Sequence, residues 1–96
     1  MSSYTLSGEA DADIEGIAQD SLQRWGLAHT EKYILGFHEA FQRLAEFPDI
    51  GRNASYIRSG YMRMETASHS VFYRKTEGGL LIVRVLHQRM DFARHL

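Results

Sequence analysis

The chain has 96 residues, of which 44% are hydrophobic and 24% charged, with a formal net charge of −1 at neutral pH. This length predicts one domain, over residues 1–96, and the absence of cysteine excludes disulfide frameworks and thiolate metal sites. Neither a signal peptide nor an apolar run near the ~20 residues of a membrane-spanning helix is seen, so we expect a cytoplasmic protein without membrane contact.

The first predicted elements are a short strand at residues 4–6 and an amphipathic helix after it. Ser7 suits the N-cap of this helix, and carboxylates follow in the first turns, where the helix dipole favours negative charge. Apolar residues recur at helical spacing from Ile14 to Trp25. The helix should end there, because Gly26 suits the position after a helix C-terminus.

A second amphipathic helix is predicted to start near His29 or Thr30. Its apolar stripe begins at Tyr33, and it must end near Phe47, because Pro48 disfavours helical geometry in the residue before it. Two amphipathic helices joined by a short glycine-containing link predict an antiparallel helical hairpin. Neither helix can bury its stripe without a further layer.

The second half of the chain alternates polar loops with strand-like segments. Residues 49–60 read as a polar loop, and strands are predicted at 61–65, 70–75 and 80–87. The last of these is the longest and most apolar, so we expect it inside the sheet; the polar tail from Gln88 should be only partly ordered. The order β-α-α-β-β-β predicts a two-layer α+β domain, in which the N-terminal strand and the helical hairpin pack on a small antiparallel β-sheet.

Charge is distributed unevenly along the chain. Residues 1–51 carry three cationic and nine acidic side chains, a net charge of −6, whereas residues 52–96 carry eight and three, a net charge of +5. A basic half favours an anionic partner, either nucleic acid or an acidic protein segment. A solvated sheet face without a partner would have the same composition.

Simple metal, phosphate and nucleophile motifs are absent from the sequence. The five histidines form no H-x-x-x-H or H-E-x-x-H pair, so no metal site is predicted. Gly78 and Gly79 lie between two strands, which indicates a hairpin turn rather than a phosphate-binding loop. Adjacent strand residues point to opposite faces, so His69 cannot activate the neighbouring Ser68 or Ser70. No cofactor is implied.

Arginines and histidines of the second half are the main candidates for function. Metal-independent RNA cleavage needs an acid, a base and cations, and His87 with His95, and Arg63 with Arg89, supply those types. A surface that binds an acidic protein segment would contain the same residues. A third interpretation is structural, with strand arginines paired to acids on the helices. In that case the paired residues would be Arg74 and Arg84.

Most aromatic side chains fall on the apolar stripes, so we expect them in the core rather than on a base-stacking platform. Those expected in the core are Trp25, Tyr33, Phe37, Phe41 and Phe72, whereas Tyr56 and Tyr61 are expected nearer the surface. Long amphipathic helices on a small sheet also leave an apolar groove open. A partner helix or extended segment would fill such a groove.

Taken together, several stretches resemble the ParE branch of the RelE/ParE superfamily of toxins from bacterial type II toxin–antitoxin modules. They are Tyr4-Thr5-Leu6-Ser7, Arg24-Trp25-Gly26, Phe47-Pro48-Asp49-Ile50-Gly51-Arg52, Ile57-Arg58-Ser59-Gly60-Tyr61, Ser68-His69-Ser70-Val71-Phe72-Tyr73-Arg74 and Val85-Leu86-His87-Gln88-Arg89-Met90-Asp91. The resemblance implies a helical hairpin on a small antiparallel sheet and neutralisation by a ParD-like antitoxin. ParE-like toxins inhibit DNA gyrase, whereas RelE-like relatives cut mRNA on the ribosome.

The resemblance also bears on the choice between these activities. RelE-like enzymes carry lysines in the loop before the second strand, arginines on that strand and after the last strand, and a near-terminal tyrosine. Arg63 and Arg89 match the two arginines, but residues 49–60 contain no lysine, and Phe92 and His95 stand in the region of the tyrosine. A non-enzymatic gyrase inhibitor is therefore favoured over an endoribonuclease. An inactive member that retains only antitoxin binding is the third alternative.

These interpretations assign residues to two partners. The residues expected to contact the target are Arg63, His87, Arg89 and His95. Those expected to contact the antitoxin are Arg58, Arg74, Tyr33 and Phe37. The antitoxin should carry an acidic and apolar C-terminal segment that suits the basic half, and contact with DNA would occur only through the antitoxin or gyrase.

Overall fold

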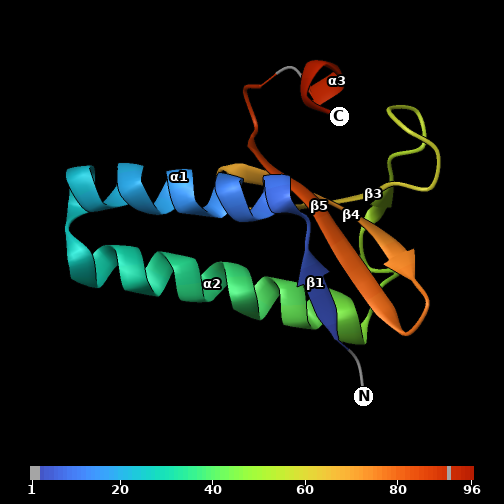
Figure 1. The fold of residues 1–96 in the computed structure, drawn as a ribbon, viewed down its shortest axis with the longest axis horizontal. Helices are drawn as coiled ribbons and strands as arrows, with labels where there is room; N and C mark the ends of the chain where they lie inside the picture. The colour runs from blue at the N-terminus through green and yellow to red at the C-terminus, as the bar shows by residue number, and fades with distance from the viewer. Residues whose placement is uncertain (1–2, 91) are drawn as a thin grey trace.

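The structure is a computed structural model that describes residues 3–90 and 92–96. The elements are β1 (Tyr4–Leu6), α1 (Gly8–Trp25), α2 (Leu27–Glu46), β2 (Arg52–Asn53), β3 (Met62–Thr66), β4 (His69–Thr76), β5 (Gly79–His87) and α3 (Phe92–His95). In the described residues, α1 and α2 lie side by side against one face of a five-stranded sheet (Figure 1). The predicted α+β fold is confirmed. Asp91, which ends the last stretch that carried the resemblance, lies outside the described residues.

The helical hairpin forms as predicted, with a tighter connection. The Ser7 hydroxyl caps α1 by accepting a hydrogen bond from the backbone N–H of Ala10 at 2.9 Å. Gly26, with φ of +86°, is the only residue between α1 and α2. The second helix therefore begins at Leu27, and the predicted start near His29 or Thr30 is wrong. The N–H of Thr30 already bonds the carbonyl of Gly26 at 3.2 Å.

The sheet has the strand order β1-β5-β4-β3-β2 and is mixed rather than purely antiparallel. Neighbouring pairs among β2, β3, β4 and β5 are antiparallel, whereas β1 pairs in parallel with β5 through Tyr4↔Leu80 and Leu6↔Ile82. Short hairpin connections force antiparallel pairing, but the chain between β1 and β5 is long enough to permit either direction. As predicted, the last strand is the longest and has partners on both sides.

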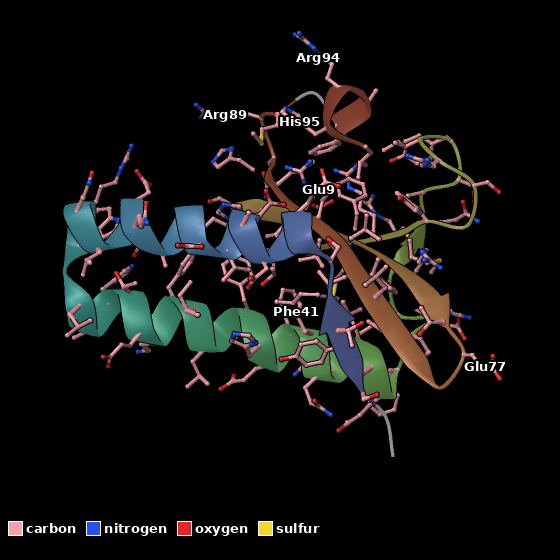
Figure 2. All side chains as sticks on the ribbon, in the orientation of Figure 1. Glu9, Phe41, Glu77, Arg89, Arg94 and His95 are labelled. Atoms are coloured by element: carbon pink, nitrogen blue, oxygen red, sulfur yellow. The ribbon has the colours of Figure 1, made fainter. Side chains whose placement is uncertain are left out.

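The main core lies between the helical hairpin and the sheet. Figure 2 shows Phe41 among the side chains between α2 and the strands, and its side chain is fully buried. Phe37 of α2 and Val71 and Tyr73 of β4 belong to the same cluster. On β4, Phe72 points to the opposite face, because strand side chains alternate. The predicted burial of Phe37, Phe41 and Phe72 is confirmed.

The far end of the hairpin is exposed instead. Figure 1 shows α1 and α2 extending past the sheet, so their last and first turns have no strands to cover them. Trp25 is 65% exposed and Leu22 is 48% exposed. The expectation that Trp25 lies in the core is therefore wrong, because helical periodicity identifies a face but not how far the opposite layer reaches. None of the helices in the described residues is long and apolar enough to cross a membrane.

The face of the sheet away from α1 and α2, called here the outer face, carries a second small core. Ala54, Phe72 and Leu86 are buried there, and Phe92 of α3 packs against them. The tail was expected to be polar and only partly ordered. The structure instead places a helical turn over this cluster, because Phe92 finds an aromatic partner in Phe72 at a ring distance of 5.0 Å.

The segment between α2 and β3, predicted as a polar loop, is paired and hydrogen-bonded to the sheet. It contains the short strand β2, and the hydroxyl of Tyr73 donates to the carbonyl of Pro48 at 2.8 Å and accepts from the N–H of Gly51 at 3.1 Å. A Cβ at Gly51 would lie 2.3 Å from that hydroxyl oxygen. Glycine is therefore required for this close approach.

Candidate functional site

A row of side chains crosses the outer face and brings two of the candidate arginines near α3. Phe72 of β4 is the cross-strand partner of Arg63 on β3 and of Arg84 on β5. Directly opposed residues share a sheet face, so Arg63 and Arg84 start from the same face as Phe72, and the Arg63 Cζ lies 5.8 Å from the centre of the Phe72 ring. This row lies beneath the α3 turn, whose Phe92 packs on the same ring.

The guanidinium of Arg63 is held on three sides. Its Nε donates to Glu65 Oε1 at 2.5 Å, its Nη1 donates to the hydroxyl of Tyr56 at 3.1 Å, and its Cζ lies 4.6 Å from the centre of the Phe92 ring. Partial burial acts to lower the pKa of Arg63, but the hydrogen bonds to Tyr56 and Glu65 outweigh it and the pKa is raised. Arg63 is therefore a fixed, neutralised cation under α3 rather than a free one.

Glu65 is the acceptor around which this part of the outer face is organised. Its carboxylate accepts from Arg63, from the Ser70 hydroxyl at 2.5 Å and from Arg52 Nη2 at 3.0 Å. Burial acts to raise the pKa of Glu65, but the hydrogen bonds from Ser70 and Arg63 outweigh it and the pKa is lowered. Glu65 remains ionised and keeps Arg63 in place.

Arg84 joins the sheet to α1. Its Nε and Nη2 donate to the two carboxylate oxygens of Asp13 at 2.8 and 2.9 Å, and Asp13 also accepts from the N–H of Val85 at 2.9 Å. A bidentate pair of this kind is the strong form of an ion pair. The hydrogen bond to Asp13 is the main reason that the pKa of Arg84 is raised. The structural interpretation is confirmed for Arg84, whereas Arg74 is exposed and makes no ion pair within the described residues.

Besides the contact of Phe92 with Phe72, the α3 segment is held on the outer face through backbone carbonyls. Arg84 Nη1 donates to the carbonyl of His95 at 2.8 Å, and Arg58 Nη1 donates to the carbonyl of Leu96 at 3.1 Å. The side chains of Arg94 and His95 stay exposed, and Figure 2 shows them with Arg89 at the end of the molecule that carries α3. The fold thus holds a short helix by its carbonyls and leaves its cationic side chains available.

A groove runs under the helical hairpin on the other face of the sheet. It encloses about 620 Å³, and its lining includes Asp13, Asp20, Trp25, Tyr33, His69 and His87. The His69 ring is hydrogen-bonded through Nδ1 to the Tyr33 hydroxyl at 3.1 Å and lies 5.4 Å from the His87 ring. Burial, and secondarily the nearby His87, lower the pKa of His69. The candidate antitoxin residue Tyr33 therefore belongs to a histidine-containing groove.

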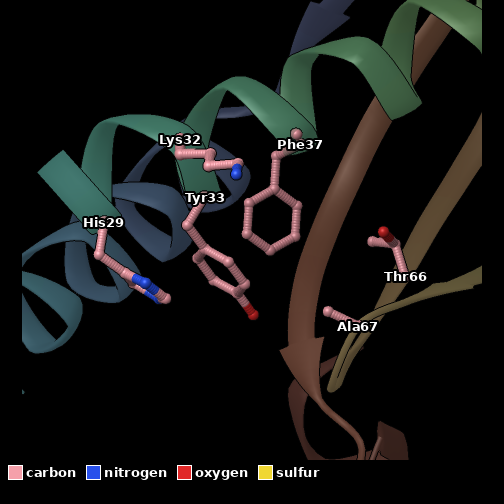
Figure 3. A pocket seen from close by; sticks show the side chains of 7 residues that line it. His29, Lys32, Tyr33, Phe37, Thr66 and Ala67 are labelled. Carbon is pink, nitrogen blue, oxygen red and sulfur yellow. The ribbon is translucent and has the colours of Figure 1, made fainter. Parts of the chain in front are cut away.

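A smaller apolar hollow of about 370 Å³ adjoins this groove and shares His29 and Tyr33 with it. Figure 3 shows the Phe37 and Tyr33 rings on one side, Thr66 and Ala67 on the other, and the ammonium group of Lys32 beside the Phe37 and Tyr33 rings. An apolar lining with a cation at the rim suits an apolar side chain that has a carboxylate next to it.

The four expected target residues do not form one cluster. His87 faces the helix side, where its cross-strand partner is His69, whereas Arg63 lies on the outer face. Arg89 lies in the turn after β5 and His95 on α3, and both are exposed. Nearness in the sequence does not decide which face of a sheet a side chain occupies, because one residue reverses it. Their role in target contact stays a prediction.

Several residues that organise these surfaces were not singled out from the sequence. Asp13, Tyr56 and Glu65 hold the arginines, and His69 pairs with His87. Of these contacts, only the pair of Arg63 and Glu65 is indicated by the sequence, because the two residues are two apart on a predicted strand and therefore share a face. No three potential metal-ligating side chains converge anywhere in residues 3–90 and 92–96.

The chain is similar to known proteins in both sequence and fold. A family described as the ParE toxin of the type II toxin–antitoxin system parDE matches residues 4–92. Toxin ParE1 of Mycobacterium tuberculosis is 45% identical over 96 residues, covering 99% of this chain and 98% of its own. Toxin ParE1 of Caulobacter vibrioides is 38% identical, covering 100% and 99%, and Toxin ParE of Escherichia coli is 31% identical, covering 100% and 94%.

Among solved structures, a chain of the chromosomal ParDE TA system from P. aeruginosa has the same fold. The TM-score is 0.76 at 19% sequence identity, and the match covers 91% of this chain and 96% of that one. At this identity the likeness supports the fold alone. The sequence relatives, which match over almost their whole length, support the family.

Proposed function

The chain belongs to the ParE family of toxins of type II toxin–antitoxin systems, and from that membership we propose that it inhibits DNA gyrase and is neutralised by a ParD-like antitoxin. The single observation that carries this proposal is the family match over residues 4–92, together with full-length relatives that are called ParE toxins. Inhibition would need binding alone, because an inhibitor that stalls gyrase on DNA requires no chemistry of its own.

The antitoxin would bind across the helical hairpin and its groove. The apolar hollow between Phe37 and Ala67 accepts an apolar side chain, and Lys32 at its rim pairs with an adjacent carboxylate. Tyr33 contributes the hydroxyl that already bonds His69. An acidic and apolar antitoxin segment has the complementary chemistry.

The other two expected antitoxin contacts differ in their availability. Arg74 on β4 is exposed, so its guanidinium can donate hydrogen bonds directly to a carboxylate of the antitoxin. Arg58 is exposed as well, but it already donates to the Leu96 carbonyl. An antitoxin that engaged Arg58 would therefore compete with one of the contacts that hold the chain after α3.

Gyrase would be contacted by the exposed cations around α3. Arg89 and His95 are the direct candidates, because their side chains are exposed. Arg63 supports them from below, since its guanidinium is occupied by Glu65 and lies over Phe92. His87 lies on the helix side and would act on this surface only through the turn that it begins.

The endoribonuclease alternative finds less support in the same geometry. RNA cleavage needs an acid, a base and cations that converge on one phosphate. Here His87 and Arg63 lie on opposite faces of the sheet, and Glu65 already neutralises Arg63. Cleavage of mRNA on ribosomes, with gyrase left active, would support this alternative.

The deciding experiment is a gyrase supercoiling assay with purified protein free of antitoxin, scored for covalent gyrase–DNA cleavage complexes. We expect inhibition that added antitoxin reverses. Arg89→Gln and His95→Gln should weaken inhibition, whereas Arg43→Gln, on the exposed side of α2, serves as the matched control. Folded, growth-arresting protein that leaves gyrase active but cleaves mRNA on ribosomes would replace this proposal with the alternative.

The antitoxin contact is tested separately by titration with the purified partner. Lys32→Glu places a negative charge at the rim of the apolar hollow and should weaken binding of an acidic segment at least tenfold, as expected for like charges brought together at an interface. Arg43→Glu makes the same charge change elsewhere on α2 and should have little effect. Equal affinities for the two variants would place the antitoxin elsewhere.

A further inference from the structure

The tight loop between β3 and β4 contributes to the walls of both cavities on the helix side of the sheet. β3 ends at Thr66 and β4 begins at His69, so Ala67 and Ser68 form a two-residue loop. Thr66 and Ala67 line the apolar hollow, whereas Ser68 and His69 line the groove. Figure 3 shows Ala67 across the hollow from the Tyr33 ring. The position of this loop therefore sets the width of the hollow.

Ala67 has a backbone conformation that alanine rarely adopts. Its φ is +51°, and within the described residues it is the only residue other than glycine with a positive φ. A two-residue hairpin loop with a positive φ at its first position favours glycine there, because a Cβ is crowded in the left-handed region. The loop contains alanine although its backbone would be more stable with glycine. A strained residue in the wall of a cavity indicates that its side chain has a role there.

Gln88 restrains this loop from the other side. Its backbone N–H donates to the carbonyl of Ser68 at 2.9 Å, and its side-chain Nε2 donates to the carbonyl of Ala67 at 2.9 Å. Gln88 directly follows β5, and its side chain is exposed. An unfavourable φ persists only where surrounding contacts fix it. The two hydrogen bonds from Gln88 provide such a restraint for both residues of the loop.

We propose that Ala67 determines which apolar side chain the hollow accepts and that Gln88 is the positioning residue for Ala67. The methyl group of Ala67 bounds the hollow opposite the rings of Tyr33 and Phe37. The occupant is an apolar residue of the antitoxin with a carboxylate next to it, because Lys32 lies at the rim. This inference rests on the proposed placement of the antitoxin and adds the residue that selects its side chain.

The variant Ala67→Gly separates a role in binding from a role in folding. It should raise the Tm of the free toxin by roughly 2–6 °C, because the strain that is relieved exceeds the entropy that glycine adds to the unfolded chain. It also removes a methyl group from the wall of the hollow. Antitoxin affinity should therefore fall roughly fourfold, the transfer free energy of one such group. A residue with only a structural role would not weaken binding while stabilising the fold.

The experiment combines thermal unfolding of the free toxin, followed by circular dichroism, with titration of each variant with the purified antitoxin. Gln88→Glu replaces the donor Nε2 by an oxygen that cannot bond the Ala67 carbonyl, so antitoxin affinity should fall here as well. Gln42→Glu makes the same change of charge on α2, outside the residues that line the hollow, and is the matched control. Equal affinities of Gln88→Glu and Gln42→Glu would remove the positioning role of Gln88.

Two results would overturn the role of Ala67. They are an Ala67→Gly variant that binds the antitoxin as tightly as the wild type, and a Tm that falls in this variant. Lys32→Glu separates these results from failure of the proposed function. If Lys32→Glu weakens binding and Ala67→Gly does not, the antitoxin occupies the hollow and only the role of Ala67 is wrong. If neither variant changes the affinity, the antitoxin binds elsewhere and both proposals are wrong.

Discussion

At the scale of single residues, Asp13 makes contacts that its position in the sequence does not predict. In the first turns of α1 it resembles its neighbours, which are acids that suit the helix dipole. In the fold its side chain is only 14% exposed, and its carboxylate accepts two hydrogen bonds from Arg84 and one from the N–H of Val85, beyond the end of β1. The Asp13 carboxylate is thus the hydrogen-bond acceptor both for the Arg84 guanidinium and for a backbone N–H of β5 that β1 does not reach.

Asp13→Ala should lower the free energy of unfolding by about 2–3 kcal/mol, because it leaves a mostly buried guanidinium and a backbone N–H without their acceptor. Urea unfolding followed by circular dichroism measures this change. Asp20→Ala removes the same residue type from the same helix but breaks only the exposed pair with Arg24, and should cost about 0.5 kcal/mol or less. Equal losses in the two variants would contradict this account of Arg84.

His69 gives stability a dependence on pH. Burial first, and the charge of His87 second, lower the pKa of His69 in the folded state below its ordinary value. The unfolded chain then binds a proton more readily than the folded protein, so stability rises with pH. The contribution of neutral His69 to the free energy of unfolding is fully present above the ordinary histidine pKa of about 6.5, and it is lost as the pH falls from there through the pKa of the folded state.

His69→Asn should therefore show a smaller loss of stability than the wild type when unfolding is compared at pH 7.5 and 5.5. The amide of asparagine can still bond the Tyr33 hydroxyl without titrating. His29→Asn, at an exposed position on α2, is the control and should keep the wild-type dependence. An unchanged pH dependence in His69→Asn would assign the effect to another group.

At the scale of elements, α3 is a helix that its own sequence does not stabilise. One turn is far below the length at which a helix is stable in water. It exists because Phe92 packs on Phe72 and Arg63, while Arg84 and Arg58 bind carbonyls of the last residues. The same reasoning explains why a polar, partly ordered tail was expected from the sequence.

Phe92→Ala should detach α3 without unfolding the domain. The loss of apolar contact costs about 1 kcal/mol of global stability, whereas hydrogen-exchange protection in Phe92–Leu96 should disappear. Amide exchange measured by NMR separates the two effects. Arg94→Ala changes an exposed residue of the same helix and should leave the protection intact. Protection that persists in Phe92→Ala would show that the backbone contacts alone hold the helix.

At the scale of the whole molecule, the charge asymmetry has two roles. Part of it joins the layers, since Arg84 pairs with Asp13 and Glu9 of α1, and Lys75 pairs with Asp49 after α2. The rest, such as Arg74, Arg89 and Arg94, stays exposed at the surface. A partner that is acidic would be attracted by this second part.

Association with an acidic antitoxin should therefore slow by roughly tenfold or more between low salt and 0.5 M salt, because screening shortens the range of attraction. Stopped-flow mixing of the purified partners measures the rate constant. The dissociation rate should change much less, since contacts within the apolar hollow are screened little. An association rate that does not depend on salt would contradict electrostatic steering.

The local chemistry of the chain was enough to predict most of the elements. The local signals depend on short-range sterics and hydrogen bonding between neighbouring residues, so they can be recognised in the sequence itself. They are the Ser7 cap, the helix end at Gly26, the break before Pro48 and the 3.6- and 2-residue periodicities. The resemblance to ParE toxins added the family, which the comparisons confirmed.

Only the tertiary structure decided what lies opposite each element. It paired β1 in parallel with β5, exposed Trp25 at the end of the hairpin, and put Arg63 and His87 on opposite faces of the sheet. These outcomes depend on layer size, strand register and contacts between distant segments. A local pattern identifies an apolar face or a cation, but the free energy of burial and pairing depends on the partner that folding brings to it.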